Sequence, residues 1–328
     1  MDEEMLERLR TFFASEFPDG RPEVSNLLNT SLGRSRENWS FDLAWHDEGR
    51  ERLEPLMLRR DPLGGLVETE RSKEFAILRA LEAASVPAPA GRWLDAAGNW
   101  FERPSLIMRR EPGTCDYYVL NGSLPLEERV ALAEQFCDLL AQVHSVDWRG
   151  SELAHIFSDP GANAALAELD QWEAVLRADQ REPYPEVDLA IQWMRTAAPT
   201  AQATVLVHGD YKPGNILLEG TRLVALLDWE LAHLGDPMED VGWVTQPLRR
   251  REHIIPGAWE ESQIFDRYQK ATGFTVHEED VRWWQVFATL RTAVMQVSGL
   301  RSFLDGRSEQ SYRPTAKVLR SLLDSVTS

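Results

Sequence analysis

Hydrophobic positions in the first third of the chain change their period several times. Residues 2–17 repeat apolar side chains at the spacing of an amphipathic helix, whereas residues 41–45 alternate apolar and polar side chains as a half-buried strand does. The alternation returns at 56–58, and a helical pattern follows over 69–84 before β-like segments on both sides of 96–99. The order strand, strand, strand, helix, strand, strand predicts an α+β unit with a mainly antiparallel sheet.

Helical spacing dominates the remaining two thirds of the chain. The clearest signal covers 125–146, where apolar side chains recur every three or four residues. Two short β-prone runs, at 204–207 and 223–227, interrupt the helices on either side of a Pro-Gly turn. Further helices are expected near 163–178, 185–198, 258–271, 277–299 and 312–326.

The change from β-like to helical patterning suggests a division of the chain. A length of 328 residues corresponds to two units at a scale of about 150 residues each. The segment Glu111-Pro-Gly-Thr114 lies at the change and has the residues of a turn or linker. We therefore expect lobes over 1–110 and 111–328, as two parts of one fold rather than two independent domains.

Composition narrows the classes of partner. Hydrophobic residues make up 43% and charged residues 27% of the chain, which is typical of a soluble globular protein. The formal charge of −18 disfavours nucleic acid and anionic membranes as partners, because both are polyanions. An acidic N-terminus and the lack of a long apolar run predict neither a signal peptide nor a membrane span. Two cysteines are too few for a disulfide framework or a zinc site. We expect a cytoplasmic protein that handles a small molecule; no oligomeric state is predicted.

The candidate chemistry lies around the two β-prone runs. Asp210 and Asn215 are separated by a Pro-Gly turn, and Asp228 follows at the end of the second run. If the two runs form a small hairpin, these three oxygen-bearing side chains meet at its mouth. Phosphoryl transfer needs a carboxylate to accept the proton of a hydroxyl, and oxygen ligands for Mg²⁺ on the nucleotide phosphates. Asp210 is the candidate base, and Asn215 and Asp228 are the candidate metal ligands.

The same segment resembles a known family. The pattern His-Gly-Asp-x4-Asn at 208–215 is similar to the catalytic loop of the aminoglycoside phosphotransferase/choline kinase-like superfamily, relatives of protein kinases. Leu227-Asp-Trp-Glu230 stands where protein kinases have the Asp-Phe-Gly metal motif, and 226–241 looks like the subgroup that includes kinase domains associated with acyl-CoA dehydrogenases. The resemblance implies a bilobal protein-kinase-like fold, with a small antiparallel-sheet N-lobe that binds nucleotide and a larger, mostly helical, catalytic and substrate-binding C-lobe.

The resemblance also implies supporting residues near the catalytic loop. His208 would brace the loop rather than accept the proton, and Glu230 would support the metal motif. Asp236 and Asp240 are candidates for support of the metal site, but Asp beside Gly or Pro more often forms a turn or a helix cap. His144 is interpreted as a structural histidine at a helix C-terminus.

In the first lobe, the resemblance implies a basic residue on a strand paired with Glu on the following helix. Arg59 fills the strand position and Glu74 the helix position, since the one lysine of this region lies in the helix. Arginine departs from protein kinases but suits phosphate, because its guanidinium binds two oxygens at once. The alternative is that Arg59 belongs to a solvated strand end.

Two segments that contact the nucleotide, ATP or GTP, are implied in the same way. Gly33 and Ser35 fall in the expected phosphate-covering loop, although one glycine alone is typical of a hairpin turn. Arg109 and Glu111 fall at the expected hinge between the lobes, where backbone groups would meet adenine.

The acceptor is a small hydroxylated molecule whose identity the pattern leaves open. Arg249 and Arg250 are candidates to hold an anionic group such as the phosphates of a coenzyme A thioester, and Trp243 is a candidate to line the pocket for it. The alternatives are a solvated helix end for the two arginines and core packing for the tryptophan. Residues 114–328 hold 32 acidic and 19 basic residues, a balance that would attract a cationic antibiotic instead. The hypotheses are therefore a hydroxyacyl-CoA or other metabolite kinase, an aminoglycoside or macrolide resistance enzyme, and a catalytically silent nucleotide-binding pseudokinase.

Overall fold

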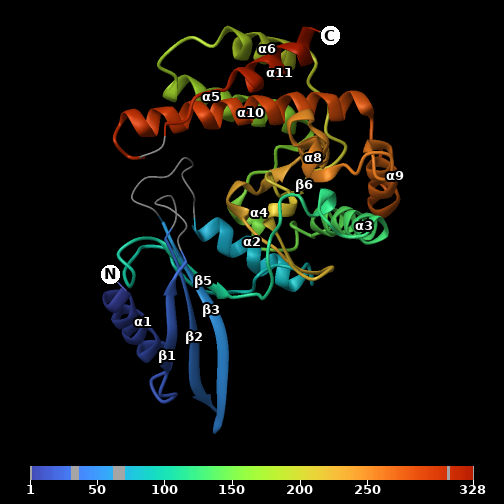
Figure 1. The fold of residues 1–328 in the computed structure, drawn as a ribbon. Coiled ribbons are helices and arrows are strands. Elements are labelled where there is room, and N and C mark those ends of the chain that lie inside the picture. Colours follow the sequence, from blue (N-terminus) through green and yellow to red (C-terminus); the bar gives the residue numbers. More distant parts are fainter. Residues whose placement is uncertain (1, 31–36, 62–70, 309–310, 328) are drawn as a thin grey trace.

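The N-terminal part of the computed structural model is a five-stranded antiparallel sheet with one helix, α1 (Asp2–Glu16), along its side (Figure 1). The structure describes residues 2–30, 37–61, 71–308 and 311–327. The strands have the order β1-β2-β3-β5-β4 across the sheet. They are β1 (Glu23–Asn29), β2 (Glu37–Asp47), β3 (Arg50–Arg60), β4 (Gly91–Asp95) and β5 (Ser105–Arg109).

The alternating pattern of β2 and the helical pattern of α1 meet in one small core. Phe41 and Leu43 of β2 are fully buried, and so are Leu9 and Phe13 of α1. Each side chain of this kind stabilises the fold by about 1.5–3 kcal/mol when it leaves water. The predicted α+β unit with an antiparallel sheet is confirmed.

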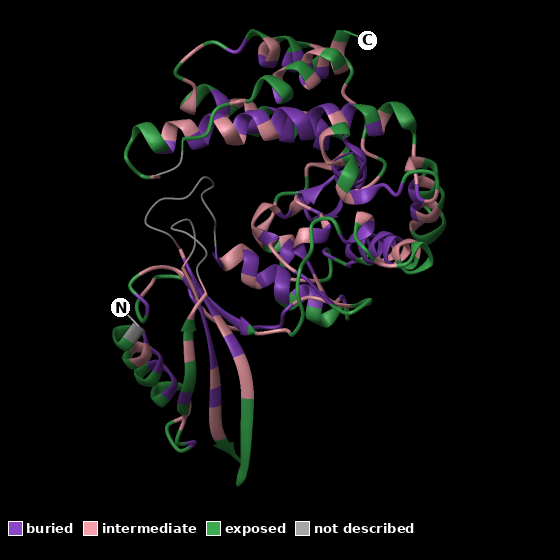
Figure 2. Ribbon diagram, viewed as in Figure 1, coloured by how far each residue is buried: buried purple, intermediate pink, exposed green. Residues whose placement is uncertain are grey.

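A second and larger core extends through the helical part of the chain. It begins at α2 (Arg71–Ala83), whose Ile77, Leu78 and Leu81 are buried among residues of the later helices. The long helix α10 (Glu278–Leu304) passes through it, and Figure 2 shows buried residues along most of its length. The other α-helices are α3 (Leu126–His144), α4 (Leu153–Ile156), α5 (Ala164–Asp179), α6 (Pro185–Thr196), α7 (Met238–Thr245), α8 (Arg250–His253), α9 (Glu261–Thr272) and α11 (Ala316–Thr327).

The pairing of the short strands differs from the expectation. The runs at 204–207 and 223–227 do not form a hairpin with each other. Strand β6 (Val205–Val207) pairs with β9 (His233–Gly235), and β8 (Arg222–Leu226) pairs with β7 (Ile216–Glu219). The physical reason is proximity, because β7 and β8 are joined by a tight turn, whereas closing the longer loop to β6 costs more chain entropy. The loop that carries Asp210 therefore lies between two small sheets.

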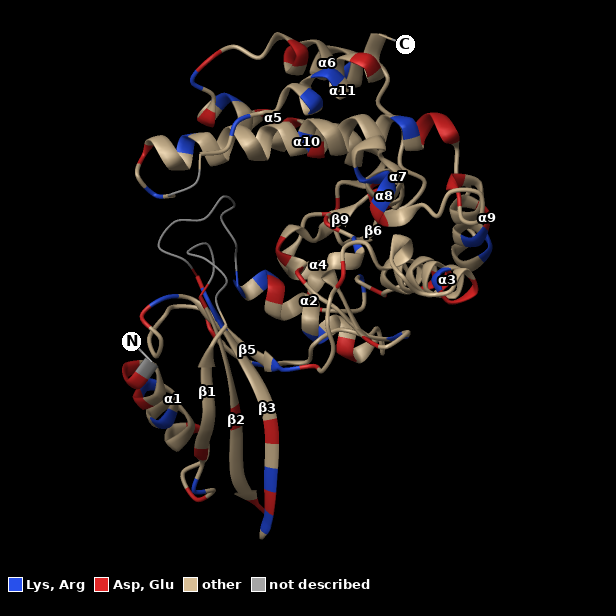
Figure 3. Cartoon of the chain, viewed as in Figure 1, with Lys and Arg blue, Asp and Glu red and all other residues tan. Residues whose placement is uncertain are grey.

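The expected linker is tied to the second of these sheets. Thr114 and Leu218 exchange backbone hydrogen bonds of 3.0 Å, which hold the chain after β5 against β7. The division at 110 and 111 stays a prediction; α2, which precedes it, packs in the larger core. Acidic and basic residues are interspersed along the helices in Figure 3. None of the described helices combines the length and hydropathy that a membrane crossing requires.

Candidate functional site

The loop after β6 brings Asp210 and Asn215 together. Asn215 ends a 3₁₀ turn, η3 (Pro213–Asn215), and its Nδ2 donates to the carbonyl oxygen of Asp210 at 3.0 Å and to Asp210 Oδ2 at 3.1 Å. Lys212 Nζ lies 2.5 Å from the same Oδ2. Both donors act on one carboxylate oxygen, so they fix the orientation of Asp210 in the loop.

Gly209 permits the turn into this loop. Its φ of 78° lies in the left-handed region, and a Cβ there would stand 2.7 Å from the carbonyl oxygen of Leu231. Any other residue would push the loop away from the segment after β8.

Asp228 lies two residues after the end of β8 and faces the same loop. It has φ 71° and ψ 59°, a left-handed conformation that Asp tolerates better than most residues. The N–H of Leu227 donates to the carbonyl oxygen of Asn215 at 2.8 Å, which holds the two candidate ligands next to each other. Since Asn215 Nδ2 faces Asp210, its amide oxygen and the carboxylate of Asp228 provide the hard oxygen donors that Mg²⁺ prefers. The donor set fits this ion.

Arg59 approaches this pair from the sheet. Its NH1 lies 2.5 Å from Glu74 Oε1 on α2, and its NH2 lies 3.5 Å from Asp228 Oδ1. Arg71 contacts the other oxygen of Glu74 and, through Nε, Asp61 at 2.7 Å. The Arg59 side chain is 8% exposed, which excludes a solvated strand end.

The neighbouring Arg60 points to the opposite face of β3, as the pleat of a strand requires. There it contacts Glu37 at 2.5 Å and lies over the ring of Trp39, 5.0 Å from the ring centroid. Only the first residue of the Arg59-Arg60 pair therefore belongs to the candidate site.

These side chains surround a cleft of ≈ 330 Å³ between the sheet and the catalytic loop. It is lined by Asn38, Met57, Arg59, Glu74, Leu78, Pro89, Met108, Tyr117, Asn215, Leu227, Asp228 and Trp229. The lining combines polar side chains with apolar side chains from β3, α2 and β5, a combination that suits a nucleotide with charged phosphates and a flat base.

The expected hinge residues lie at the end of β5. Arg109 Nε is 3.3 Å from Glu111 Oε1, and the backbone N–H of Arg109 donates to Ala90 at 2.8 Å. That N–H is therefore already occupied. Gly33 and Ser35 lie outside the described residues.

His208 holds the catalytic loop through three hydrogen bonds. Its Nδ1 accepts from the N–H of Asp210 at 3.1 Å, so the proton is on Nε2, which donates to the carbonyl of Leu227 at 2.9 Å. Its backbone N–H donates to Asp240 at 2.7 Å. Complete burial lowers the pKa of His208, although neighbouring carboxylates oppose the shift. These contacts are those of a neutral bracing residue.

Asp240 has a role that the sequence interpretation missed. It lies in the first turn of α7 but caps nothing there; its two oxygens accept from the N–H groups of His208, at 2.7 Å, and Gly209, at 2.9 Å. His144 Nε2 lies 3.1 Å from it. Burial alone would raise the pKa of Asp240, but His144 and the backbone donors outweigh burial and lower it. The turn-or-cap interpretation is wrong for Asp240 and fits Asp236, which accepts from Met238 N–H at 2.9 Å.

His144 is buried, and its ring contacts explain why. Nδ1 lies 2.5 Å from the hydroxyl of Tyr268, while Nε2 holds Asp240. The role of His144 is therefore structural, and it depends on contacts with these two side chains rather than on the dipole of its own helix.

Two further residues near Asp210 have little or no sequence pattern that predicts their place in the site. Lys212 stands inside the motif, and its distance of two residues from Asp210 was the available clue. Arg291, on α10, donates to the carbonyl of Gly209, 82 residues away, and no local pattern marks it.

A second cavity, of ≈ 550 Å³, adjoins the cleft and shares Glu74 and Trp229 with it. Glu230 is part of its wall, together with residues of α2, α5 and α10. Its described lining includes none of Arg249, Arg250 and Trp243.

The three remaining candidates have other contacts. Trp243 is 2% exposed and packs in the large core, with the guanidinium of Arg249 over its ring at 4.5 Å. Arg249 also pairs with Glu252 at 3.0 Å, and Arg250 with Glu260 and Glu261, both at 2.7 Å. The structure therefore does not bring them to the cavity beside the catalytic loop.

Comparison with known proteins decides the family. The model of the phosphotransferase enzyme family matches residues 34–284, which include the catalytic loop, Arg59 and Asp228. The chain belongs to the phosphotransferase enzyme family. Mouse acyl-CoA dehydrogenase family member 10 is 31% identical over 192 residues, which are 57% of this chain and 18% of that protein. Human acyl-CoA dehydrogenase family member 11 is 24% identical over 194 residues, 58% of this chain and 25% of that protein. The chain thus spans less than a third of these relatives.

Solved structures of this phosphotransferase's neighbours confirm the bilobal protein-kinase-like fold. A protein from Ralstonia eutropha JMP134, whose name refers to the aminoglycoside phosphotransferases, has a TM-score of 0.72 at 22% identity, covering 98% of this chain and 95% of that one. Aminoglycoside phosphotransferase APH(4)-Ia in a ternary complex with AMP-PNP and hygromycin B has a TM-score of 0.59 at 19% identity, with 97% of both chains covered. The resemblance inferred from the catalytic loop, including the acyl-CoA dehydrogenase-associated subgroup, is confirmed.

Proposed function

We propose that this phosphotransferase transfers the γ-phosphate of ATP, or GTP, to a hydroxyl group of a small molecule in a Mg²⁺-dependent reaction. The observation that carries the proposal is the convergence of Asp210, Asn215 and Asp228 from two small sheets. The Arg59–Glu74 pair faces them across the cleft. Base, metal ligands and phosphate-binding cation are thereby present together.

The nucleotide would lie in the cleft of ≈ 330 Å³. Glu74 orients the guanidinium of Arg59 toward the phosphates, and the apolar lining holds the base near the Arg109 carbonyl and the Glu111 backbone. Gly33 and Ser35 are proposed to cover the phosphates. Mg²⁺ would be held by Asn215 and Asp228, where it would neutralise charge on the phosphate oxygens.

The acceptor would enter from the second cavity. Asp210, oriented by Asn215 and Lys212, would accept a hydrogen bond from the hydroxyl and then its proton, while His208 keeps the loop in place. The division into a nucleotide-binding lobe, 1–110, and a catalytic lobe, 111–328, and a cytoplasmic location belong to the same proposal.

A hydroxylated metabolite, such as a hydroxyacyl-CoA, is favoured over an antibiotic. Two buried carboxylates in the wall of the second cavity are already paired: Glu74 with Arg59, and Glu168 with His233 at 3.4 Å. A polycationic antibiotic would have to break such pairs, which costs several kcal/mol for each buried charge left unpaired. The acyl-CoA dehydrogenase names of the curated relatives point in the same direction.

Two alternatives rest on particular observations. Structural neighbours were solved with hygromycin B or streptomycin, which supports antibiotic phosphorylation. Arg59 in place of lysine supports a silent nucleotide-binding pseudokinase, but the complete set of Asp210, Asn215 and Asp228 opposes it. If Arg249 and Arg250 hold an anionic tail, that tail must compete with their present acidic partners.

Calorimetric titration with AMP-PNP tests the nucleotide part of the proposal. We expect binding that Mg²⁺ strengthens, and loss of the Mg²⁺ effect in Asp228→Ala. Asp236→Asn is the matched control, because Asp236 contacts Met238 and Trp284. Equal binding with and without Mg²⁺ in the unaltered protein would contradict the assigned metal ligands.

A further inference from the structure

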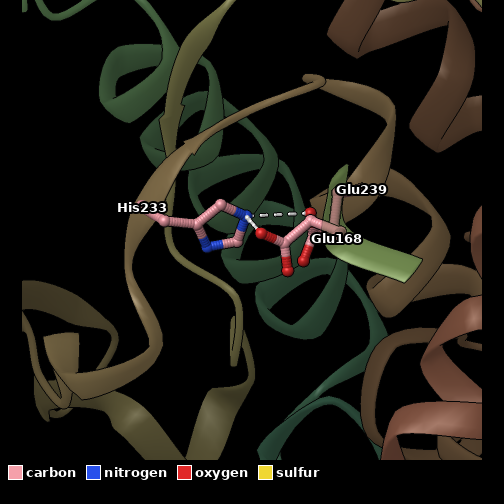
Figure 4. Close-up of side chains that lie close together, drawn as sticks. All are labelled: Glu168, His233 and Glu239. Carbon is pink, nitrogen blue, oxygen red and sulfur yellow. Dashed lines mark hydrogen bonds and ion pairs between the residues drawn. The ribbon is translucent and has the colours of Figure 1, made fainter. Parts of the chain in front are cut away.

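Four charged or ionisable side chains from four elements meet beside the second cavity. They are Glu168 of α5, His233 of β9, Glu239 of α7 and Arg291 of α10. Figure 4 shows both carboxylates on the Nε2 side of the imidazole ring. Nε2 lies 3.1 Å from Glu239 and 3.4 Å from Glu168, and Glu239 in turn lies 2.7 Å from Arg291 NH1. We call these residues the His233 cluster.

The hydrogen bond of Nδ1 determines the protonation of Nε2 in the His233 ring. Nδ1 lies 2.9 Å from the carbonyl oxygen of Leu231, which can only accept, so Nδ1 bears a proton. An unprotonated Nε2 would then direct its lone pair at two carboxylates. A proton on Nε2 removes this repulsion and makes the ring an imidazolium. Burial would lower the pKa of His233, but Glu168 and Glu239 outweigh burial and raise it to about 10.

A metal ion is the competing occupant, because the three ligand atoms lie within 4.8 Å of one another. The charge balance favours the proton. Two carboxylates, Arg291 and an imidazolium sum to zero, whereas a divalent ion with a neutral imidazole leaves an excess positive charge beside the buried Glu168, Glu239 and Arg291. Arg291 already holds one oxygen of Glu239, and a buried excess charge is strongly unfavourable.

The His233 cluster is joined directly to the catalytic loop. NH2 of Arg291 donates to the carbonyl oxygen of Gly209, the residue before Asp210. The N–H of Gly209 donates to Asp240 at 2.9 Å. Two consecutive residues of α7 therefore hold the backbone of Gly209. Asp240 binds its N–H directly, and Glu239 binds its carbonyl oxygen through Arg291.

The same cluster faces the space assigned to the acceptor. Glu168, His233 and Arg291 all line the second cavity. We propose that His233 is a positioning residue for phosphoryl transfer: as an imidazolium it fixes Glu239 and, through Arg291, the peptide that carries Asp210. The kinetic consequence of this inference rests on the proposed function. The protonation state of His233 rests on the geometry of the cluster alone.

Two measurements that need no substrate test the protonation state. In protein labelled with ¹⁵N-histidine, we expect both ring nitrogens of His233 to be protonated at neutral pH, with the signals assigned by their loss in His233→Gln. Metal analysis of the purified protein should find no equivalent of bound metal that is present in the unaltered protein and absent from His233→Gln. A non-protonated Nε2, or one bound metal equivalent lost in His233→Gln, would overturn the proposal even if the enzyme is active.

Kinetics with Mg²⁺ and ATP test the positioning role, with water or the identified hydroxyl compound as acceptor. His233→Gln should lower kcat about 10- to 100-fold while the KM for ATP stays unchanged, because it shifts the loop rather than the nucleotide contacts. The double variant His233→Gln/Glu168→Gln removes one negative charge as well, restores neutrality, and should recover part of kcat. His46→Gln, on an exposed residue, is the control.

The double variant separates positioning by charge from simple packing. If His233 only fills space, the second substitution adds a further defect and kcat falls again. Such a further fall, with both variants folded by thermal unfolding, overturns the positioning role. Failure of every variant and of the unaltered protein to turn over ATP, with the imidazolium observed, would instead contradict the proposed function.

Discussion

Arg59 and Glu74 form a buried ion pair with 2.5 Å between NH1 and Oε1, and this pair connects β3 of the sheet to α2. Its second guanidinium nitrogen faces Asp228 at 3.5 Å. Lysine offers one point charge, whereas the arginine fork can keep Glu74 and still present an N–H to a phosphate. The departure from protein kinases is therefore consistent with retained nucleotide binding.

Replacement of Arg59 tests this interpretation. Arg59→Met should raise the KM for ATP roughly tenfold or more, because a charge-assisted hydrogen bond to phosphate is lost. Arg59→Lys should be intermediate, because it keeps the charge without the fork. Steady-state kinetics or nucleotide titration measures the effect. Arg60→Met is the matched control on the opposite face of β3; an equal KM change in both variants would contradict the assignment.

Asp240 is predicted to affect turnover without touching the nucleotide. Asp240→Asn leaves one oxygen to serve two backbone N–H donors, so the loop loses a hydrogen bond and kcat should fall about 10- to 100-fold. The free energy of unfolding should fall by about 1–3 kcal/mol. Asp236→Asn lies near the same helix start and should lower stability without lowering kcat. Equal kcat values in the two variants would show that the contact with the loop has no catalytic role.

Stability should depend on pH above neutrality through His233. Its pKa is about 10 in the folded protein, above the ordinary value of 6.5. The stabilisation is therefore complete below pH 6.5 and is lost as pH rises toward 10, with a slope of at most about 1.4 kcal/mol per pH unit. Urea unfolding of the unaltered protein and of His233→Gln between these limits measures it. Identical slopes for the two proteins would be incompatible with a bound proton on His233.

The antibiotic alternative predicts a phenotype that we do not expect. Expression of the protein in a sensitive bacterium should leave the inhibitory concentrations of hygromycin B and streptomycin unchanged, because the buried carboxylates Glu74 and Glu168 are already paired. Asp210→Asn is the control for expression. Tolerance that rises with the unaltered protein and disappears in Asp210→Asn would make the enzyme an antibiotic phosphotransferase.

The predictable part of the site is the part that local chain connectivity determines. Asp210 and Asn215 are joined by a short turn, and β7 and β8 return the chain directly to Asp228, so their spacing alone places them together. Arg59 follows from the resemblance, which implies a basic residue on the strand before the helix that carries Glu74. The expected pairing of 204–207 with 223–227 is wrong because the apolar run of β7 is a closer partner for β8.

The contacts that the sequence does not predict act over long separations. Arg291 reaches Gly209 from a helix whose apolar periodicity reports only its burial, and Asp240 reaches two N–H groups more than thirty residues earlier. No local period encodes such contacts, since they depend on how α7 and α10 pack. The same holds for His233, whose neighbours come from three other elements.

The central claim is phosphoryl transfer to a small hydroxylated molecule with Asp210 as the base. The most direct test incubates the protein with ATP, Mg²⁺ and a metabolite extract that includes hydroxyacyl-CoA compounds, and compares mass spectra with those from Asp210→Asn. We predict a compound that gains one phosphoryl group in the presence of the unaltered protein and not of the variant. The same phosphorylated product at the same rate from Asp210→Asn would contradict the account.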